Sequence, residues 1–280
     1  MQLRDAILGR LGAGTTIEDV ALTLLALRRT GRSPEALINT QQSSGAWSAT
    51  FRVGLPSVYH TALAVLALRE FDTPLAHEAA DRAFRWLTTI QGREAHWLWQ
   101  WKFRLFDRQV RFDPSKYGWP WIPDTVSWVA PTALSILAFR CWNRSSPRLK
   151  PAADMLMDRA CAGGGWNAGN SIVFGVNLDP HPDFTAMAVL ALHTFRPQGQ
   201  SQVEASLDYL AARLSEAPSP YSLAWGVVAL SAYAHGGAHR LRNQLEECTL
   251  AKLNRLPDRV LALAALSLED PPYTFVRTAR

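Results

Sequence analysis

The sequence predicts an all-α protein, in which one α/α toroid domain spans residues 1–280 and about six inner and six outer helices form a closed double ring. A sequence pattern of small residues and leucine recurs six times. Each copy is apolar on nearly every side, as is typical of a helix surrounded by protein. The intervening segments have a 3.6-residue period and one charged face, which predicts outer helices. Six pairs favour ring closure, because an open solenoid would leave one row of apolar helices exposed.

The expected elements follow in chain order. Inner helices are expected over residues 20–27, 61–68, 132–139, 185–192, 223–230 and 260–268. Outer helices are expected over residues 75–90, 148–160, 201–214 and 238–253, with shorter ones over 3–11 and 34–41. Serine or threonine before proline marks helix starts at 33–34, 73–74, 146–147 and 219–220, because a hydroxyl caps the helix and proline suits its first turn. Thr15 and Glu18 fit a capping box for the first inner helix.

One stretch, residues 92–125, breaks the period and is rich in aromatic residues. Trp97, Trp99, Trp101 and Phe103 alternate with other residues, which is the periodicity of a strand, and residues 109–112 follow as a candidate returning strand. A small β-hairpin or loop insertion is therefore expected here. Its aromatic side chains would form a lid or wall over a central cavity.

Composition and charge limit the classes of partner. The net charge of +5 comes almost wholly from arginine, and arginines scattered over amphipathic helices usually mark a solvated face. The alternative is attraction to an anionic substrate, such as a diphosphate, or peripheral contact with a lipid surface. No nucleic-acid motif occurs, so no nucleic-acid partner is expected.

The compartment is expected to be the cytoplasm. The longest apolar run, residues 62–68, is far shorter than the roughly 20 residues that cross a bilayer. The first ten residues contain an early acid and lack the apolar stretch of a secretion signal. Cys141, Cys161 and Cys248 form no metal-binding motif, and three buried thiols suit a reducing compartment.

Repeated tryptophan motifs resemble those of a known superfamily. The run from Gln41 to Gly45-Ala46-Trp47 is similar to the Gln-Trp repeat of squalene-hopene and related triterpene cyclases, in the prenyltransferase/squalene cyclase repeat superfamily. Partial copies are expected at Gln91 with Trp97 and at 163–167, which includes Trp166. The segments 59–62 and 183–186 resemble inner-helix starts of the same superfamily. This resemblance implies an α/α toroid, and fold alone does not set an activity.

The resemblance also implies one candidate catalytic acid. Cyclases of this kind that protonate an alkene use an Asp-x-Asp-Asp motif just before an inner helix, where this chain has His181-Pro182-Asp183-Phe184. With Thr185 aligned, Asp183 takes the place of the proton donor and His181 replaces the first aspartate. Burial and a neighbouring cation or donor are what such an acid needs. The alternative is that Asp183 only caps the fourth inner helix.

Aromatic residues are the candidate substrate-binding groups, because ring faces stabilise a carbocation. The expected substrate-binding residues are Tyr59, His60, Trp99, Trp119, Trp121, Trp128 and Trp166. Each tryptophan has an alternative role as a packing anchor of the repeat. His60 has the alternative of a polar residue at a helix start.

The functional hypotheses follow from these residues. The first is a terpene cyclase-like protein that binds a hydrophobic isoprenoid or terpenoid in a central cavity and cyclises or isomerises it with Asp183 as general acid. The second is a non-catalytic repeat scaffold that associates with other proteins. A third, a zinc-dependent prenyltransferase β-type subunit, shares the Tyr59-His60-Thr61 piece but lacks the Asp-x-Cys ligand pair. No metal or cofactor is expected, and a homo-oligomer or a partner subunit would close the cavity.

Overall fold

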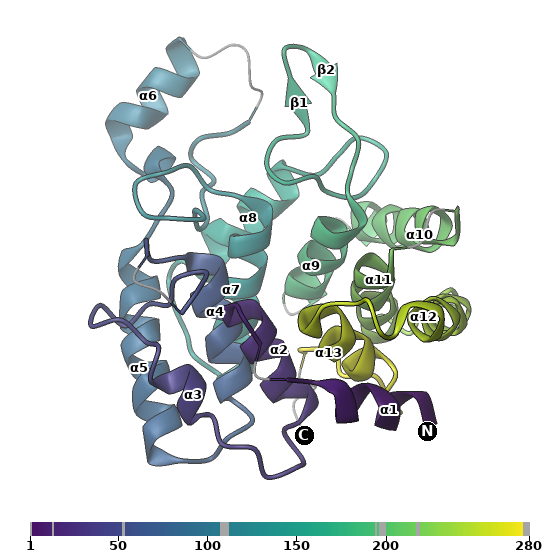
Figure 1. The fold of residues 1–280 in the computed structure, drawn as a ribbon. Coiled ribbons are helices and arrows are strands. Elements are labelled where there is room, and N and C mark those ends of the chain that lie inside the picture. The colour runs from purple at the N-terminus through teal and green to yellow at the C-terminus, as the bar shows by residue number, and fades with distance from the viewer. Residues whose placement is uncertain are drawn as a thin grey trace.

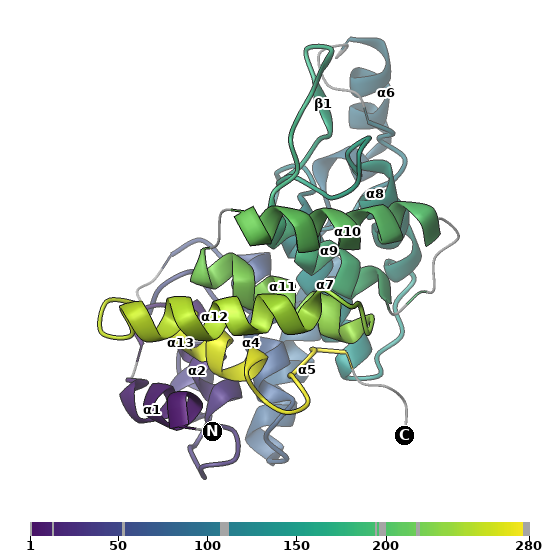
Figure 2. The ribbon, with the colours of Figure 1, turned by 90° about the vertical axis from the view of Figure 1, so that its right-hand side faces the viewer.

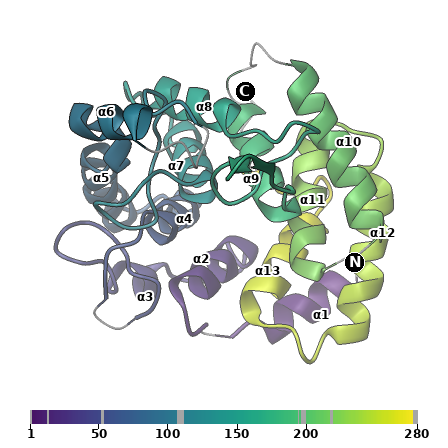
Figure 3. The same cartoon turned by 90° about the horizontal axis from the view of Figure 1, so that it is seen from above.

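The inner helices form a closed ring in the computed structural model, which describes residues 2–12, 14–51, 54–106, 112–193, 195, 200–216 and 219–276 (Figure 1). The ring contains α2 (Ile17–Ala26), α4 (Val58–Leu68), α7 (Val129–Cys141), α9 (Pro182–His193), α11 (Pro220–Ala232) and α13 (Asp258–Ser267). Each of these helices contacts the next, and α13 contacts α2, so the last inner helix closes the ring onto the first. Figure 3 shows them around a common centre. The predicted inner helices are confirmed.

The outer helices lie against the ring in the predicted order. They are α1 (Gln2–Arg10), α3 (Glu35–Ile38), α5 (Pro74–Thr89), α8 (Leu149–Asp158), α10 (Gln200–Glu216) and α12 (Ala238–Lys252). Each contacts at least one inner helix, as α5 contacts α4 and α12 contacts α11 and α13. Figure 2 shows α10 and α12 crossing this side of the molecule. The all-α fold class is therefore confirmed.

The burial of the inner helices explains the ring. In α4 every residue except His60 is buried, and α9 is buried from Thr185 to Leu192. Removing apolar surface from water stabilises by about 25 cal/mol per Å², and only a ring lets each inner helix bury all of its sides. The outer helices bury one face, as α5 does with Ala76, Ala79, Ala80, Ala83 and Leu87.

Three tryptophans anchor the repeat in the same way. The backbone N–H groups of Trp47, Trp119 and Trp166 donate to the hydroxyls of Thr61, Thr132 and Thr185, each at 2.9 Å. Each indole Nε1 donates to a carbonyl of the preceding outer helix, at Leu37, Leu87 and Leu156. All three side chains are fully buried. The connection before an inner helix is thus tied to both helices of the pair.

Gln41 strengthens the first of these connections. Its Nε2 donates to the carbonyls of Gly45 and Ala79, both at 2.8 Å, and so links the end of α3 to α5. In the second repeat the anchoring residue is Trp119, whereas the sequence predicts a partial copy at Gln91 and Trp97. That assignment is wrong, because Trp97 is largely exposed.

The capping of α2 and the cysteines differ in detail from the predictions. The capping box joins Thr16 and Asp19, because the Thr16 hydroxyl accepts from the N–H of Asp19 and the Asp19 carboxylate accepts from the N–H of Thr16. The predicted pair of Thr15 and Glu18 is therefore displaced by one residue, which leaves the Glu18 side chain for other contacts. Cys141 and Cys161 are buried as expected, but Cys248 is partly exposed.

The aromatic insertion forms a helix where a strand was predicted. Residues 97–105 form α6 (Trp97–Leu105), preceded by the short 3₁₀ helix η1 (Arg93–Ala95). The helix brings Trp99 and Phe103 to one face, with ring centroids 6.0 Å apart, so alternate aromatic positions need not imply a strand. The expected returning strand, 109–112, lies outside the described residues except for Phe112. The small hairpin is elsewhere, as β1 (Ile172–Val173) pairs antiparallel with β2 (Val176–Asn177).

The C-terminal segment packs onto the ring after α13. Phe275 is buried, and its ring stacks on the fully buried Trp225 of α11 at 5.3 Å between centroids. The Tyr273 hydroxyl donates to Glu70 at 3.0 Å, and Arg28 lies over the Tyr273 ring. Residues after α13 thus complete the core between α2, α4 and α11.

No helix in the described parts of the chain combines the length and the hydropathy that crossing a bilayer requires.

Candidate functional site

The second residue of every inner helix belongs to one set at the N-terminal end of the ring, which we call the mouth. These six residues are Glu18, Tyr59, Ala130, Asp183, Tyr221 and Arg259. They hold corresponding positions in the first turn of each helix. Because neighbouring inner helices contact one another, polar residues at these positions are brought together although they are far apart in the sequence.

Glu18 connects three inner helices at the mouth. Its Oε1 accepts hydrogen bonds from the hydroxyls of Tyr59, at 3.0 Å, and Tyr221, at 2.9 Å. The two phenol oxygens are 3.4 Å apart. Burial, together with the charge of Glu18 and the other phenol, raises the pKa of Tyr59 well above its usual value, and burial likewise raises that of Tyr221. Both phenols therefore remain neutral hydrogen-bond donors.

Asp183 is the candidate acid of the mouth. Its Oδ1 is buried and has no hydrogen-bond partner among the described residues. Burial raises the pKa of the Asp183 carboxyl, while a hydrogen bond with Ser222, the charge of His181 and a hydrogen bond with the backbone N–H of Asp183 act in the opposite direction. Burial without full hydrogen bonding favours the protonated form, which is the form a general acid needs.

His60 and Trp121 flank Tyr59. The Tyr59 ring lies 5.2 Å from the His60 ring and 5.0 Å from the Trp121 ring. His60 Nδ1 is 2.8 Å from the Ser57 hydroxyl, and burial lowers the pKa of His60 to about 4. At neutral pH the histidine is uncharged, so the mouth contains neutral aromatic and phenolic groups beside the carboxyl groups of Glu18 and Asp183 and the guanidinium of Arg259, which pairs with Asp19 at 3.6 Å.

The structure separates the sequence-predicted residues into groups. Tyr59, His60 and Trp121 form one cluster at the mouth, while Asp183 contacts Ser222, the residue after Tyr221. His181 precedes α9 and is exposed, with its ring 5.8 Å from that of Phe184.

The predicted tryptophans have different surroundings. Trp119 and Trp166 are the buried anchors described above, so packing is the role that their geometry supports. Trp128 directly precedes α7 and is half-buried, with its ring against Gly169. Trp99 lies on α6, where Arg93 and Lys102 stand over its ring at 4.8 and 4.4 Å.

Sequence reasoning missed Glu18 and Tyr221. The sequence predicts a capping role for Glu18, and Tyr221 precedes the expected inner helix over residues 223–230. The signal that identifies both is positional, because each is the second residue of its inner helix, as are Tyr59 and Asp183. Aligning the inner helices on their caps, rather than on their leucines, brings these four residues into one column.

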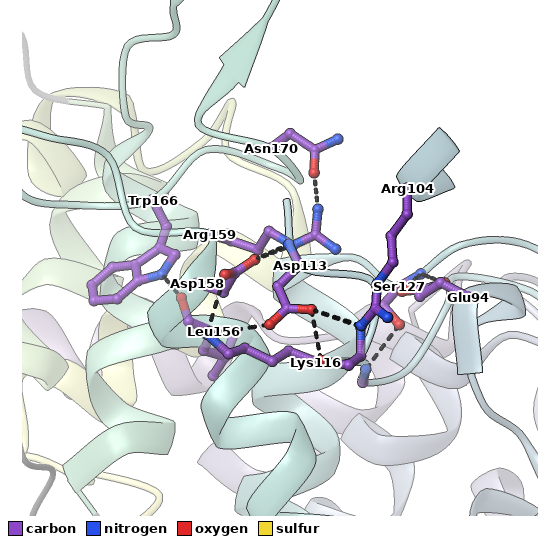
Figure 4. Close-up of polar contacts among 12 residues, drawn as sticks. Glu94, Arg104, Asp113, Lys116, Ser127, Leu156, Asp158, Arg159, Trp166 and Asn170 are labelled. Carbon is purple, nitrogen blue, oxygen red and sulfur yellow. Dashed lines mark hydrogen bonds and ion pairs between the residues drawn. The ribbon is translucent and has the colours of Figure 1, made fainter. Parts of the chain in front are cut away.

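The base of the aromatic insertion is fixed to α8 by a polar network (Figure 4). The Asp158 carboxylate accepts from the N–H of Asp113 at 2.9 Å and from Lys116 at 3.4 Å. The guanidinium of Arg159 is buried, donates to Asn170, and lies 3.9 Å from the Phe112 ring centroid. These contacts hold the insertion against the connection that leads into α9.

The N–H of Ser127 donates to both oxygens of the fully buried Glu94 at 3.0 and 3.2 Å. Glu94 thereby joins η1 to the connection that leads into α7. The insertion is thus attached to the segments that begin the third and fourth inner helices.

The opposite end of the ring carries an arginine-rich cavity of about 1190 Å³. The arginines that line it are Arg4, Arg28, Arg29, Arg69 and Arg242, together with Glu269, Asp270 and the segment up to Val276. Arg28 pairs with Glu269 at 2.5 Å, and Arg4 pairs with the same carboxylate at 2.9 Å. Arg28, Arg69 and Glu269 follow the C-terminal ends of the inner helices α2, α4 and α13, so the cavity and Asp183 lie at different ends of the ring. Among the described residues no three His, Cys, Asp or Glu side chains form a group suited to a metal ion.

Comparisons with known proteins support the fold alone. No protein-family model matches the chain, and no curated protein matches it. The structure is similar to that of a Salmonella alpha-2-macroglobulin mutant, Y1175G, with a TM-score of 0.52 and 15% identity over 95% of this chain. Salmonella alpha-2-macroglobulin reacted with methylamine gives a TM-score of 0.51 and 14% identity, again over 95% of this chain. The chain spans 17% of the length of each of these proteins.

Proposed function

We propose that the chain binds a hydrophobic isoprenoid-like ligand at the mouth of the ring and isomerises or cyclises it, with Asp183 as the general acid. The observation that carries this proposal is the buried, unpartnered Oδ1 of Asp183 at the second position of α9. The carboxyl group accepts from the backbone N–H of Asp183 itself, as a helix cap accepts from N–H groups of the first turn, but its Oδ1 has no partner among the described residues. Tyr59, Trp121 and Tyr221 supply ring faces suited to a carbocation.

The proposed step is a proton transfer to an alkene. The protonated Asp183 carboxyl gives its hydrogen to one carbon of a C=C bond, the π electrons form the new C–H bond, and positive charge develops on the other carbon. A second double bond of the same ligand attacks this carbon if a ring is formed. Loss of a proton from a neighbouring carbon to the Asp183 carboxylate restores both the alkene and the acid, so the net reaction is an isomerisation.

The test is incubation of the purified protein with squalene and with C15 and C20 prenyl diphosphates, followed by phosphatase treatment and gas chromatography. We expect a new product with the wild-type chain and at least about a 100-fold lower yield with Asp183→Asn, since a general acid contributes 10² to 10⁴ in rate. Asp179→Asn is the matched control, because Asp179 is exposed and lies four residues earlier. Thermal unfolding of both variants separates loss of activity from loss of fold.

Two outcomes would overturn this proposal. One is the absence of any product from the wild-type chain with all three substrates. The other is a product whose yield is the same with Asp183→Asn as with Asp179→Asn, since the proton would then come from elsewhere.

A second candidate function is a non-catalytic scaffold that associates with another protein chain. The observation that favours it is the stacked pair Trp225 and Phe275, which fills space within the core of the ring. Native mass spectrometry discriminates the two candidates. A defined oligomer that retains no lipid supports the scaffold, and a monomer that retains an isoprenoid supports the first proposal.

A further inference from the structure

The outer face of α6 is apolar and open to solvent. Trp97 and Trp101 are each 62% exposed, and Phe106, directly after the helix, is 80% exposed. Leu98 and Leu105 are also exposed and lie beside them on the helix. Large apolar side chains grouped on one helix face mark an interaction site, unlike single exposed residues.

The other face of α6 is held by the protein. Phe103 contacts Trp99 at 6.0 Å and Phe112 at 5.1 Å between ring centroids, and Phe112 lies under the buried guanidinium of Arg159. The network around Asp158 in Figure 4 fixes the segment that carries Phe112. The exposed tryptophans are therefore presented on a supported helix.

The charges next to this face are positive. From Trp97 to Phe106 the chain carries Lys102 and Arg104 and no acid, and both basic side chains are exposed. Lys102 stands over the Trp99 ring and Arg104 lies 4.0 Å from Asp113, so both are on the flanks of the apolar face. Tryptophan, leucine and phenylalanine on one side with lysine and arginine beside them is the pattern of a helix that lies in a membrane interface.

A second apolar projection lies at the same end of the molecule. Phe174, at the turn between β1 and β2, is 71% exposed, and Val176 is exposed beside it. Figures 1 and 2 both show α6 and the β1–β2 hairpin projecting from the body in the same direction. Two separate projections with apolar tips fit a deformable surface better than the single contiguous patch of a protein interface.

We propose that the exposed apolar face of α6 and the tip of the β1–β2 hairpin insert into the interface of a lipid bilayer that contains anionic phospholipid. Trp97, Trp101 and Phe174 enter the boundary between headgroups and acyl chains, and Lys102 and Arg104 contact the anionic headgroups. The inference uses no part of the proposed reaction. It places the mouth of the ring toward the lipid, because the insertion and the hairpin lead directly into the N-termini of α7 and α9.

The test is co-sedimentation of the full chain with sucrose-loaded vesicles of phosphatidylcholine, with and without 30 mol% phosphatidylserine, in the absence of isoprenoid. The bound fraction of the wild-type chain is expected to rise at least about tenfold with phosphatidylserine and to fall as salt is added. The double variant Trp97→Ser/Trp101→Ser is expected to lose at least about tenfold in partition coefficient. Lys102→Gln/Arg104→Gln is expected to lose the dependence on phosphatidylserine.

The matched control uses leucine on two surfaces. Leu98 on α6 and Leu250 on α12 are both exposed, so Leu98→Ser should weaken sedimentation and Leu250→Ser should not. No sedimentation of the wild-type chain with either vesicle overturns the proposal. An equal loss of sedimentation with Leu98→Ser and Leu250→Ser also overturns it. So does a dimeric wild-type chain whose Trp97→Ser/Trp101→Ser variant is monomeric, because the apolar face of α6 would then bind a second copy of the protein.

Discussion

A single tryptophan of the repeat makes contacts to two helices at once. Trp166 is fully buried, its backbone N–H donates to Thr185 of α9, and its indole donates to Leu156 of α8. Removing the Trp166 side chain leaves a cavity and also leaves the Leu156 carbonyl without its indole donor. Exposed tryptophans such as Trp97 have none of these contacts.

Trp166→Ala should lower the free energy of unfolding by about 3 to 5 kcal/mol, the range for deleting a buried aromatic side chain. The same substitution at Trp97 should change it by less than about 0.5 kcal/mol, because that side chain is largely in water. Urea unfolding followed by circular dichroism measures both. Equal effects at the two positions would contradict the anchoring role of Trp166.

His60 links stability to pH. Its pKa is about 4 in the folded chain because burial disfavours the charged form, against 6.5 in the unfolded chain. Between these two values the unfolded state binds a proton that the folded state does not, so stability falls as pH decreases from about 6.5 to about 4. The full effect is at most about 3 kcal/mol.

Measuring the urea midpoint from pH 7 to pH 4 tests this dependence. His60→Gln should flatten the curve, since glutamine does not titrate, while His239→Gln on the exposed surface of α12 should leave it unchanged. A wild-type curve with the same slope as His60→Gln would show that His60 is not the titrating group.

The packing of the segment after α3 against α5 requires a glycine at position 45. Gly45 has a φ of +93°, and a Cβ at this position would lie 2.5 Å from the carbonyl oxygen of Arg82 on α5. Gly31 has a φ of +77° with no atom near such a Cβ. The two glycines share the backbone requirement and differ in the contact with the neighbouring helix.

Gly31→Ala should cost about 1 kcal/mol, the penalty of a left-handed conformation. Gly45→Ala should cost about 3 kcal/mol or more, because the clash with a backbone carbonyl adds to that penalty. Thermal unfolding of both variants gives the difference. If the two variants unfold at the same temperature, the α5 backbone is not packed against Gly45.

The helices could be predicted from the sequence because each inner helix buries all its sides and each outer helix buries one. The residue that caps α2 and the secondary structure of the insertion could not be predicted in this way. Threonine at position 15 or at position 16 could cap the helix, so the sequence alone does not decide at which of the two residues the capping box begins. In α6 an aromatic residue at every second position is the pattern of a strand, but a helix with apolar residues on two faces has the same sequence pattern.

The candidate site was predicted in part for a related reason. Asp183 and Tyr59 follow from the resemblance of inner-helix starts, but Glu18 and Tyr221 come from helices whose starts carry no such motif. Only closure of the ring places Glu18 of α2 next to Tyr221 of α11. A contact between residues 203 positions apart has no local signal in a single sequence.

At the scale of the molecule, the C-terminal segment completes the ring. Phe275 is 3% exposed and stacks on Trp225, and Glu269 accepts from Arg4 and Arg28. Phe275→Ala should lower the free energy of unfolding by about 3 to 4 kcal/mol through the cavity beside Trp225. Phe106→Ala, at an exposed position, is the control and should have little effect. An equally small effect of Phe275→Ala would show that the segment is not part of the cooperative core.

The two ends of the ring have different chemistry. The mouth carries Glu18, the phenols of Tyr59 and Tyr221, Asp183 and a single arginine, Arg259, while the opposite end carries five arginines around a cavity. A neutral or weakly polar ligand suits the first end and an anion suits the second. The mouth is therefore the proposed site of isoprenoid binding.

The measurement that tests this assignment most directly is photo-crosslinking with a diazirine-bearing C15 prenyl analogue, followed by peptide mapping. The account predicts that labelled peptides include those with Tyr59, Trp121, Asp183 or Tyr221, and that unmodified C15 ligand competes with the labelling. Labelling confined to the peptides with Arg28, Arg69 and residues 268–276 would place the ligand in the arginine-rich cavity and contradict the account.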